Sequence, residues 1–466
     1  IIARYNQPLY VAVKTRQQVA AAGGEVTVDF YLINEKNVRG NHQLKISVTD
    51  SQGKVMEVGT YETEAAGGEV YGQLLVKDVK IPVPTAGGLC RIEAKLCKEN
   101  SVVTTGYDDI LSVNLASNML DGKGAVWEDG SALQNFLKGK TKEAVAAYED
   151  NLGKLDWIMV ARPPRKDQLT MVPMEALRSA DGKPGLDVVY YEDMEFQKEV
   201  YHEVAKVVNL SAIEGATPSP FVYMLDGYGI KWSGKVLPSV SGEYTIIPQS
   251  NDRSMIEVFV NGKKIYEITR KKEHLGDGKV YLEGGKSADI EIRFRHPRSN
   301  ARCRLDWAVP NDKMPDAQRL MERAVNDGTK IFIIQSADEW SEFIAVNSKA
   351  VFKDKFFVGT NWLGGVMFNK PHDIFKELPV GNALNWPYQA LIHTGVERMG
   401  LVMEGEELLV GAYHTYPMAI GTAMGIVPMG KGSVLFSTLD IYGNIINDSA
   451  AGLVAKKLIF NMIDFK

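Results

Sequence analysis

The middle of the chain, residues 228–310, alternates short apolar runs with tight-turn signals and restricts the fold more than any other stretch. Residues 256–260 supply the β-branched and aromatic side chains that a half-buried sheet prefers. Asn261-Gly262 follows directly, and because both residues accept positive φ, the pair predicts a two-residue hairpin turn. Ser241-Gly242 and Gly284-Gly285 mark two further reversals. The stretch therefore predicts a module of short strands joined by turns.

Several spaced motifs occur in order within this part of the chain. They are a Trp-x-Gly opening at Trp232, Ser-Gly-x-Tyr-Thr from Ser241, the polar pair Asn251-Asp252, Val-Asn-Gly from Val260, Leu-Glu-x-Gly from Leu282 and Leu-x-Trp from Leu305. In this order the motifs resemble the PA14 family, a β-sandwich or barrel module of carbohydrate-active enzymes, adhesins and bacterial toxins. Residues 185–191 resemble the first strand of that family. The resemblance covers about residues 183–310.

The resemblance also implies a calcium site. Sugar-binding members of the family carry an Asp-Asp pair that holds calcium, and the calcium orients sugar hydroxyls. The matching pair here is Asn251-Asp252. Calcium favours carboxylate and carbonyl oxygens, and Asn251 offers a carbonyl oxygen without a charge. Asp252 is thus the candidate calcium ligand, and Asn251 and Asn261 are candidate carbohydrate contacts. A site without calcium is the alternative.

Aromatic side chains offer a second route to sugar binding. Tyr228, Trp232 and Trp307 have flat rings that could stack on a sugar. Trp232 and Trp307 lie in predicted strands, so a place in the core is the favoured alternative for both.

The regions on either side of this module differ in pattern. Residues 1–115 alternate polar and apolar residues in about seven short strands, for example 25–32 and 44–48, which predicts an immunoglobulin-like β-sandwich. Residues 116–182 predict an α/β order, with strands at 125–127 and 155–160 and a helix at 141–152.

The α/β pattern resumes after Pro310. Residues 316–326 predict an amphipathic helix, 330–334 a buried strand and 450–462 a closing helix. The economical interpretation is one α/β domain in two pieces, 116–182 and 311–466, interrupted by the module at 183–310. Four consecutive domains are the alternative, but they would leave the first piece with an incomplete core.

A second set of motifs lies in the later part of the chain. It comprises Gly364-Gly365, Pro371-His372, Trp386-x-Tyr388, Gly421-Thr422-Ala423-Met424 and Phe436-Ser437-Thr438-Leu439-Asp440. These resemble the glutamine-amidotransferase-like domain, flavodoxin-like in fold, that follows the barrel of large bacterial family 2 glycoside hydrolases, which are β-galactosidase-like. Residues 5–13 and the sandwich after them resemble the β-domain of the same enzymes.

This resemblance implies a scaffold rather than an active enzyme. The α/β pieces contain no cysteine, so the amidotransferase cysteine has no counterpart. No stretch provides the barrel of about 250 residues that carries the two catalytic glutamates. The sequence starts at Ile1 rather than Met, and its first residues resemble the middle of a protein chain, which agrees with a fragment. We therefore expect a non-catalytic C-terminal portion of a periplasmic or extracellular enzyme, with its catalytic domain upstream.

Other functions find less support in the sequence. The α/β pieces contain no Gly-x-Ser-x-Gly elbow and no P-loop, and His372, His393 and His414 have no metal-ligand spacing, so structural roles are favoured for them. The net charge of −5 argues against nucleic acid or an anionic membrane as a partner. No apolar run approaches the roughly 20 residues that cross a bilayer.

The sequence thus predicts an accessory region of a carbohydrate-degrading glycoside hydrolase, whose PA14-like module binds carbohydrate or positions domains. A free-standing lectin or adhesin is one alternative, and calcium bound at Asp252 would favour it. An α/β enzyme with an unrecognised active site is the other. A cleft that gathers His393, His414 and a carboxylate would favour that enzyme.

Overall fold

The computed structural model is mostly β: 51% of its residues lie in strands and 14% in helices. It divides into two compact units, one made of Ile1–Asn118, Pro371–Tyr388 and Asp448–Lys466, the other of Met119–Lys370 and Gln389–Asn447. The structure describes residues 7–68, 70–99, 101–115, 119–164, 169–211, 218–219, 226–250, 253–298, 301–310, 315–358, 365–393, 399–415, 418–446 and 450–465.

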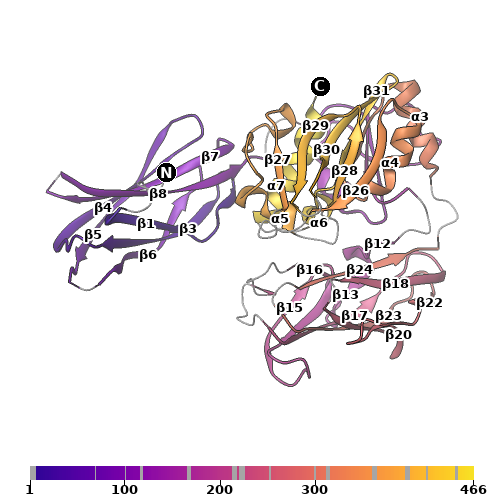
Figure 1. Cartoon of the computed structure of the whole chain (residues 1–466), viewed down its shortest axis with the longest axis horizontal. Coiled ribbons are helices and arrows are strands. Elements are labelled where there is room, and N and C mark those ends of the chain that lie inside the picture. Colours follow the sequence, from indigo (N-terminus) through magenta and orange to yellow (C-terminus); the bar gives the residue numbers. More distant parts are fainter. Residues whose placement is uncertain are drawn as a thin grey trace. The chain divides into compact units, whose positions relative to one another are not determined.

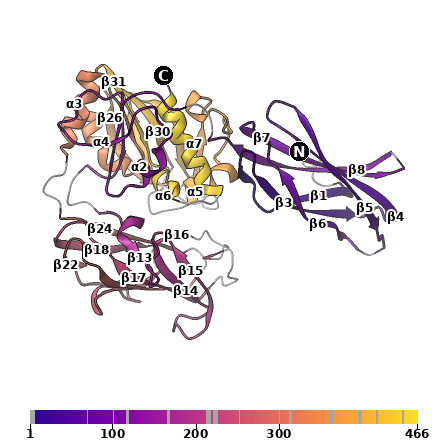
Figure 2. The same ribbon diagram turned by 180° about the vertical axis from the view of Figure 1, so that it is seen from behind.

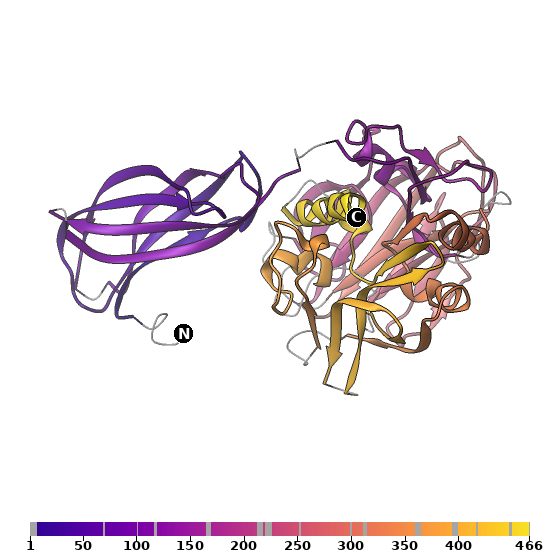
Figure 3. The ribbon, with the colours of Figure 1, turned by 90° about the horizontal axis from the view of Figure 1, so that it is seen from above.

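The first unit contains two sheets that share one core (Figures 1 and 3). One sheet has the order β1-β3-β6 and the other the order β2-β8-β7-β4-β5. Along β3, apolar residues at alternate positions from Val26 to Leu32 face the core, as the alternating sequence predicts. The strands are β1 (Leu9–Thr15), β2 (Val19–Ala21), β3 (Glu25–Asn34), β4 (Gly40–Thr49), β5 (Val55–Ala65), β6 (Gly72–Pro82), β7 (Gly88–Lys98) and β8 (Ser101–Val113).

A buried carboxylate joins β3 to β6. Asp29 accepts a hydrogen bond of 2.8 Å from the backbone N–H of Asp78 and pairs with Arg16 at 3.1 Å. The ladder between these strands is irregular here, between Val28 and Phe30, and Asp78 has a φ of 58°. The hydrogen bond from Asp78 is the main cause that lowers the pKa of Asp29, against the effect of burial. Asp29 therefore holds an irregular part of the sheet through its charged form.

The last helix of the chain, α7 (Ala450–Asp464), belongs to this first unit. It contacts β2 and β8 and the short helices η3 (Asp373–Phe375) and η4 (Trp386–Tyr388). Asn461 Nδ2 donates to the carbonyl oxygens of Ile374 and Lys376 at 2.9 and 3.0 Å. The helix itself confirms the prediction at 450–462. The elements that α7 contacts could not be predicted, because periodicity shows an apolar face but not its partner.

The second unit contains a ten-stranded mixed sheet in the order β10-β9-β11-β25-β31-β30-β28-β26, with β29 also paired to β30 and β27 to β29. Trp157 on β11 lies opposite Lys330 on β25 in parallel register, so strands from both sides of the central module are neighbours. Helices α3 (Ala317–Asp327) and α4 (Ala337–Val346) pack on one face (Figure 2). The strands are β9 (Gly124–Glu128), β10 (Ala146–Ala147), β11 (Trp157–Ala161), β25 (Lys330–Ile333), β26 (Val351–Phe357), β27 (Gly365–Asn369), β28 (Met399–Glu404), β29 (Glu407–His414), β30 (Ala419–Met429) and β31 (Gly432–Ser437).

The helix predicted at 141–152 is wrong. The structure has the short strand β10 there, paired in parallel with β9, within irregular backbone. Tyr148 donates its N–H to the carbonyl oxygen of Val126 at 2.8 Å, and its ring lies 5.7 Å from that of Trp127. Tertiary contacts to the sheet thus override the helical spacing of the apolar residues.

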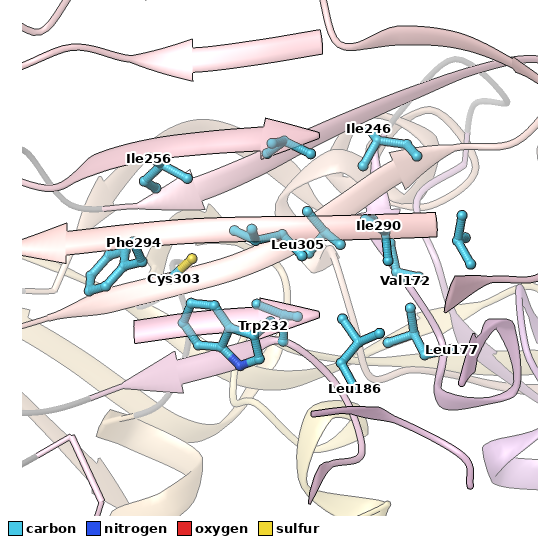
Figure 4. Close-up of a cluster of buried hydrophobic side chains, with 14 of the residues drawn as sticks. Val172, Leu177, Leu186, Trp232, Ile246, Ile256, Ile290, Phe294, Cys303 and Leu305 are labelled. Atoms are coloured by element: carbon cyan, nitrogen blue, oxygen red, sulfur yellow. The ribbon is translucent and has the colours of Figure 1, made fainter. Parts of the chain in front are cut away.

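The strands between residues 170 and 308 form two further sheets, which we call the β module. One sheet has the order β15-β14-β17-β23-β19-β20-β21, with β13 on β17; the other has the order β12-β24-β18-β22, with β16 on β24. A core of buried side chains lies between them, including Trp232, Phe294 and Leu305 (Figure 4). The strands are β12 (Thr170–Met171), β13 (Leu177–Arg178), β14 (Leu186–Tyr191), β15 (Glu199–Ala205), β16 (Asn209–Ser211), β17 (Tyr228–Val236), β18 (Gly242–Ser250), β19 (Met255–Val260), β20 (Lys263–Ile268), β21 (His274–Leu275), β22 (Lys279–Leu282), β23 (Ala288–His296) and β24 (Arg302–Ala308).

The chain enters and leaves the β module side by side. Thr170 on β12 lies opposite Trp307 on β24, and Met171 lies opposite Asp306. The next residue, Val172, donates its N–H to the carbonyl oxygen of Leu305 at 2.9 Å. Entry and exit are therefore fixed to each other by an antiparallel ladder.

Candidate functional site

A pocket of about 660 Å³ opens at one end of the β module. This volume is within the range of small-molecule sites in proteins. Basic side chains dominate its charged groups. It is lined by Met194, Glu195, Arg253, Ser254, Met255, Thr269, Arg270, Lys272, Arg295 and Pro297.

Three strand ends and one loop build this pocket. Met255 begins β19 and lies opposite Arg295 near the end of β23. Thr269 follows the last residue of β20, which pairs with Ile256 at the same end of the sheet. Residues 192–198 follow β14, whose last residue pairs with Gly229. The lining thus comes from neighbouring, hydrogen-bonded strands.

The loop at 192–198 is ordered by one carboxylate. Asp193 accepts hydrogen bonds from the backbone N–H groups of Glu195, Gln197 and Lys198, at distances from 2.6 to 3.2 Å. Within the loop Phe196 has a φ of 59°. Its ring fits only because residue 229 is glycine: a Cβ there would lie 2.7 Å from the ring.

Arg295 holds this loop against the sheet. Its Nε donates to the carbonyl oxygen of Met194 at 3.1 Å, and its guanidinium lies over the Phe196 ring, 4.6 Å from the centroid. Its Nη1 donates to Glu257 Oε2 at 2.9 Å. Burial raises the pKa of the Glu257 carboxyl, but hydrogen bonds from Arg295 and Lys264 lower it further, so the net pKa lies below the ordinary value. Arg295 is therefore a fixed, paired cation in the wall.

The floor and the rim of the pocket differ in character. Ser254 is buried in the floor, with its Oγ 3.1 Å from Nδ1 of the buried His296. On the rim, the Lys272 N–H donates to the Thr269 carbonyl oxygen at 2.9 Å, and Lys272 has a φ of 64°. This turn carries the exposed side chains of Arg270 and Lys272, and Arg253 is exposed beside the floor.

The residues predicted for calcium and sugar do not all meet here. Asn251 and Asp252 directly precede Arg253 but lie outside the described residues. Asn261 lies at the opposite end of β19, which at about 3.3 Å per residue is roughly 20 Å away. Its Oδ1 accepts from the N–H of Asp289 at 2.9 Å, which ties the hairpin turn to β23. The structure therefore separates Asn261 from the pocket.

The three aromatic candidates are buried in the core of the β module. Tyr228 is 0% exposed, and Trp232 and Trp307 are each 3% exposed. Rings enclosed by other side chains present no face to a sugar, so stacking by Tyr228 or Trp232 is corrected to a packing role. For Trp232 and Trp307 this is the alternative that the sequence favoured.

The α/β sheet offers a second place to look, because such sheets bind ligands at the carboxyl ends of parallel strands. A cavity lined by Ile334, Ser437 and Asp440 lies there, but its volume is about 20 Å³, enough for roughly one water molecule. Glu128, at the end of β9, accepts from the N–H groups of Leu133 and Gln134, which caps the short helix α2 (Ala132–Leu137).

The candidate histidines have different surroundings in the described part of the chain. His372 accepts the Ile374 N–H at 3.2 Å through Nδ1, and its ring lies 4.9 Å from that of Phe465, a structural role. His414 lies on β29, and the side chain of His393 is outside the described part of the chain.

No cluster of three or more metal-ligating side chains occurs among the residues that the structure describes. No described helix is long and apolar enough to cross a membrane.

Sequence reasoning missed the basic lining of the pocket. The run Arg270-Lys271-Lys272 was a visible signal, since it lies between two predicted strands. Arg253 and Arg295 gave no such signal, because they are distant in sequence and meet only through the pairing of β19 with β23.

Comparison with known proteins identifies the module. Residues 182–319 match the PA14 domain family. The chain is 28% identical over 127 residues to the anti-sigma-I factor RsgI3 of Acetivibrio thermocellus, a match that covers 27% of this chain and 19% of that relative. The chain thus spans about a fifth of the length of this curated relative.

Two solved structures are also similar. A β-glucosidase from Kluyveromyces marxianus aligns at 12% identity, with a TM-score of 0.33, over 48% of this chain and 30% of that one. The epithelial adhesin 9 A domain of Candida glabrata, in complex with Galβ1-3GlcNAc, aligns at 14% identity, with a TM-score of 0.23, over 32% of this chain and 89% of that one.

Proposed function

We propose that the PA14 domain of this chain binds carbohydrate in the pocket between Met194, Arg253, Arg270 and Arg295. The observation that carries this proposal is the pocket itself. It is large enough for a sugar residue, open to solvent, and lined by side chains that donate hydrogen bonds to oxygen. Sugar-complexed proteins among the similar structures agree with this role.

Three finer features belong to the same proposal. Asn251 and Asp252, next to Arg253, would place calcium beside the pocket. The chain would serve as an accessory region of a secreted or periplasmic glycoside hydrolase, with its catalytic domain upstream. The α/β sheet would act as a scaffold, since the cavity at its strand ends admits about one water molecule.

A glycan-array screen of the full chain tests the proposal, run once with calcium and once with a chelator. We expect binding to a subset of glycans. Loss of binding with the chelator would support the calcium site, and retained binding would support recognition by the pocket side chains alone. If no glycan binds under either condition, the proposal is wrong.

A pair of variants tests the location. Met194→Trp places a bulky, uncharged ring in the pocket, and we expect glycan binding to be lost. Tyr281→Trp is the matched control, because Tyr281 is 67% exposed on β22 and does not line the pocket. Binding that survives Met194→Trp would place the sugar elsewhere on the molecule. Circular dichroism of both variants verifies that the fold is retained.

A further inference from the structure

We propose that the pocket of the PA14 domain selects acidic saccharides, which carry carboxylate or sulfate groups. This inference rests on the proposed carbohydrate binding and specifies its ligand class. Four basic side chains line the pocket, Arg253, Arg270, Lys272 and Arg295, while Glu195 is the one carboxylate among the described lining residues.

Three of these cations are available to a ligand. Within the described part of the chain, the side chains of Arg253, Arg270 and Lys272 have no hydrogen bond or ion pair, and all three are exposed. Some other basic residues of the module are paired with carboxylates: Lys279 pairs with Glu243 at 3.2 Å and Arg293 with Glu291 at 2.6 Å. Arg253, Arg270 and Lys272 are therefore not paired with any carboxylate that the structure describes, Glu195 included.

The fixed cation of the wall limits what else the pocket can bind. Arg295 covers the Phe196 ring, and Lys231 lies 5.6 Å from the same ring centroid. Neutral sugars are commonly held by stacking on an open aromatic face, which none of the lining residues named above offers. Guanidinium groups instead match the planar, bidentate geometry of a carboxylate and suit the oxygens of a sulfate. The lining thus favours an anionic group on the sugar.

The direct test is isothermal titration of the full chain with a matched pair of ligands. A hyaluronan hexasaccharide carries glucuronate carboxylates, and its carboxyl-reduced form has the same backbone without the charge. We expect the acidic form to bind at least about tenfold more tightly, as charge-assisted hydrogen bonds imply. We also expect its affinity to fall as sodium chloride is raised from about 50 to 300 mM, because exposed charges are screened. Equal affinity for both forms would overturn the inference.

Variants separate specific recognition from general attraction. The double variant Arg270→Gln/Lys272→Gln should lose the preference for the acidic ligand. Lys235→Gln/Lys263→Gln is the matched control, since it removes the same charge from exposed lysines at the other end of the sheet. A control variant that loses as much affinity as the pocket variant would contradict the site.

Two further outcomes distinguish this inference from the proposal beneath it. Equal binding of polyglutamate, a polyanion without sugar, would contradict saccharide recognition. Neutral glycans that bind in the pocket, are blocked by Met194→Trp and show no preference for acidic forms would overturn the acidic selectivity and leave the carbohydrate site in place. Failure of every glycan to bind would remove both.

Discussion

At the scale of single residues, the pocket wall depends on one glycine. Gly229 lies on β17 opposite Arg295, and the Phe196 ring occupies the space where its side chain would be. Phe196 in turn supports the guanidinium of Arg295, which fixes the loop through Met194. A methyl group at residue 229 would therefore displace the Phe196 ring and, with it, the Arg295 guanidinium and the loop that it holds.

We predict that Gly229→Ala destabilises the chain by about 1–3 kcal/mol, because its Cβ would lie 2.7 Å from the Phe196 ring and 2.9 Å from the Asp193 carbonyl oxygen. Thermal unfolding measures the loss, and glycan titration should show weaker binding. Gly153→Ala is the control, since no atom lies within 4 Å of its added Cβ. An unchanged melting temperature and affinity in Gly229→Ala would contradict this account of the wall.

A second residue-scale prediction concerns pH. The pKa of Asp29 is lowered in the folded chain, so its stabilising effect is full above its unfolded pKa of about 3.9 and is lost as pH falls through the lower folded value. Asp29→Asn should cost about 1 kcal/mol or more at pH 7, where the wild-type carboxylate accepts the Asp78 N–H.

Thermal unfolding of the wild type and of Asp29→Asn across pH 2–7 tests whether the stabilising effect of Asp29 is lost as the pH falls. The difference in melting temperature between wild type and Asp29→Asn should shrink toward pH 2. A difference that stays constant over this range would show that the charge of Asp29 is not responsible.

At the scale of elements, the sequence predicted correctly a turn whose conformation depends on neighbouring residues alone. Asn261 and Gly262 have φ values of 48° and 73°, so the hairpin between β19 and β20 has the left-handed turn that the sequence predicted. The prediction of a helix at 141–152 was wrong, because residues of that segment contact partners far away in the sequence, as Tyr148 contacts Trp127. The pocket had the same limit: Arg253, Arg270 and Arg295 come together through strand pairing that no single segment encodes.

The hairpin gives an element-scale prediction. Gly262→Val introduces a β-branched side chain at positive φ, so we expect a loss of about 1–3 kcal/mol in stability. Asn261→Gly should be tolerated better, because glycine accepts the same backbone conformation. Urea unfolding of the two variants provides the comparison. Equal stability of Gly262→Val and wild type would refute the strained turn.

At the scale of the whole molecule, the paired entry and exit of the β module predict that it can be removed. Met171 and Asp306 lie opposite each other, at a spacing that a short turn bridges. Replacing residues 172–305 by a short Gly-Ser linker should leave the mixed sheet folded, because β11 pairs with β25 without the module.

Circular dichroism and a cooperative thermal transition of the shortened chain test this prediction. The spectrum should lose β signal from the module and keep the helical signal of α3 and α4. A chain that aggregates or melts without cooperativity would show that the sheet needs the module for its stability.

The place of helix α7 in the first unit affects the order in which the two units are completed during synthesis. Its contacts include β2 and β8, strands that leave the ribosome long before the helix does. Domains commonly fold as they emerge, yet this unit acquires its last element only after the second unit has been synthesised. A nascent chain thus completes the unit that it begins first only after α7 has been synthesised.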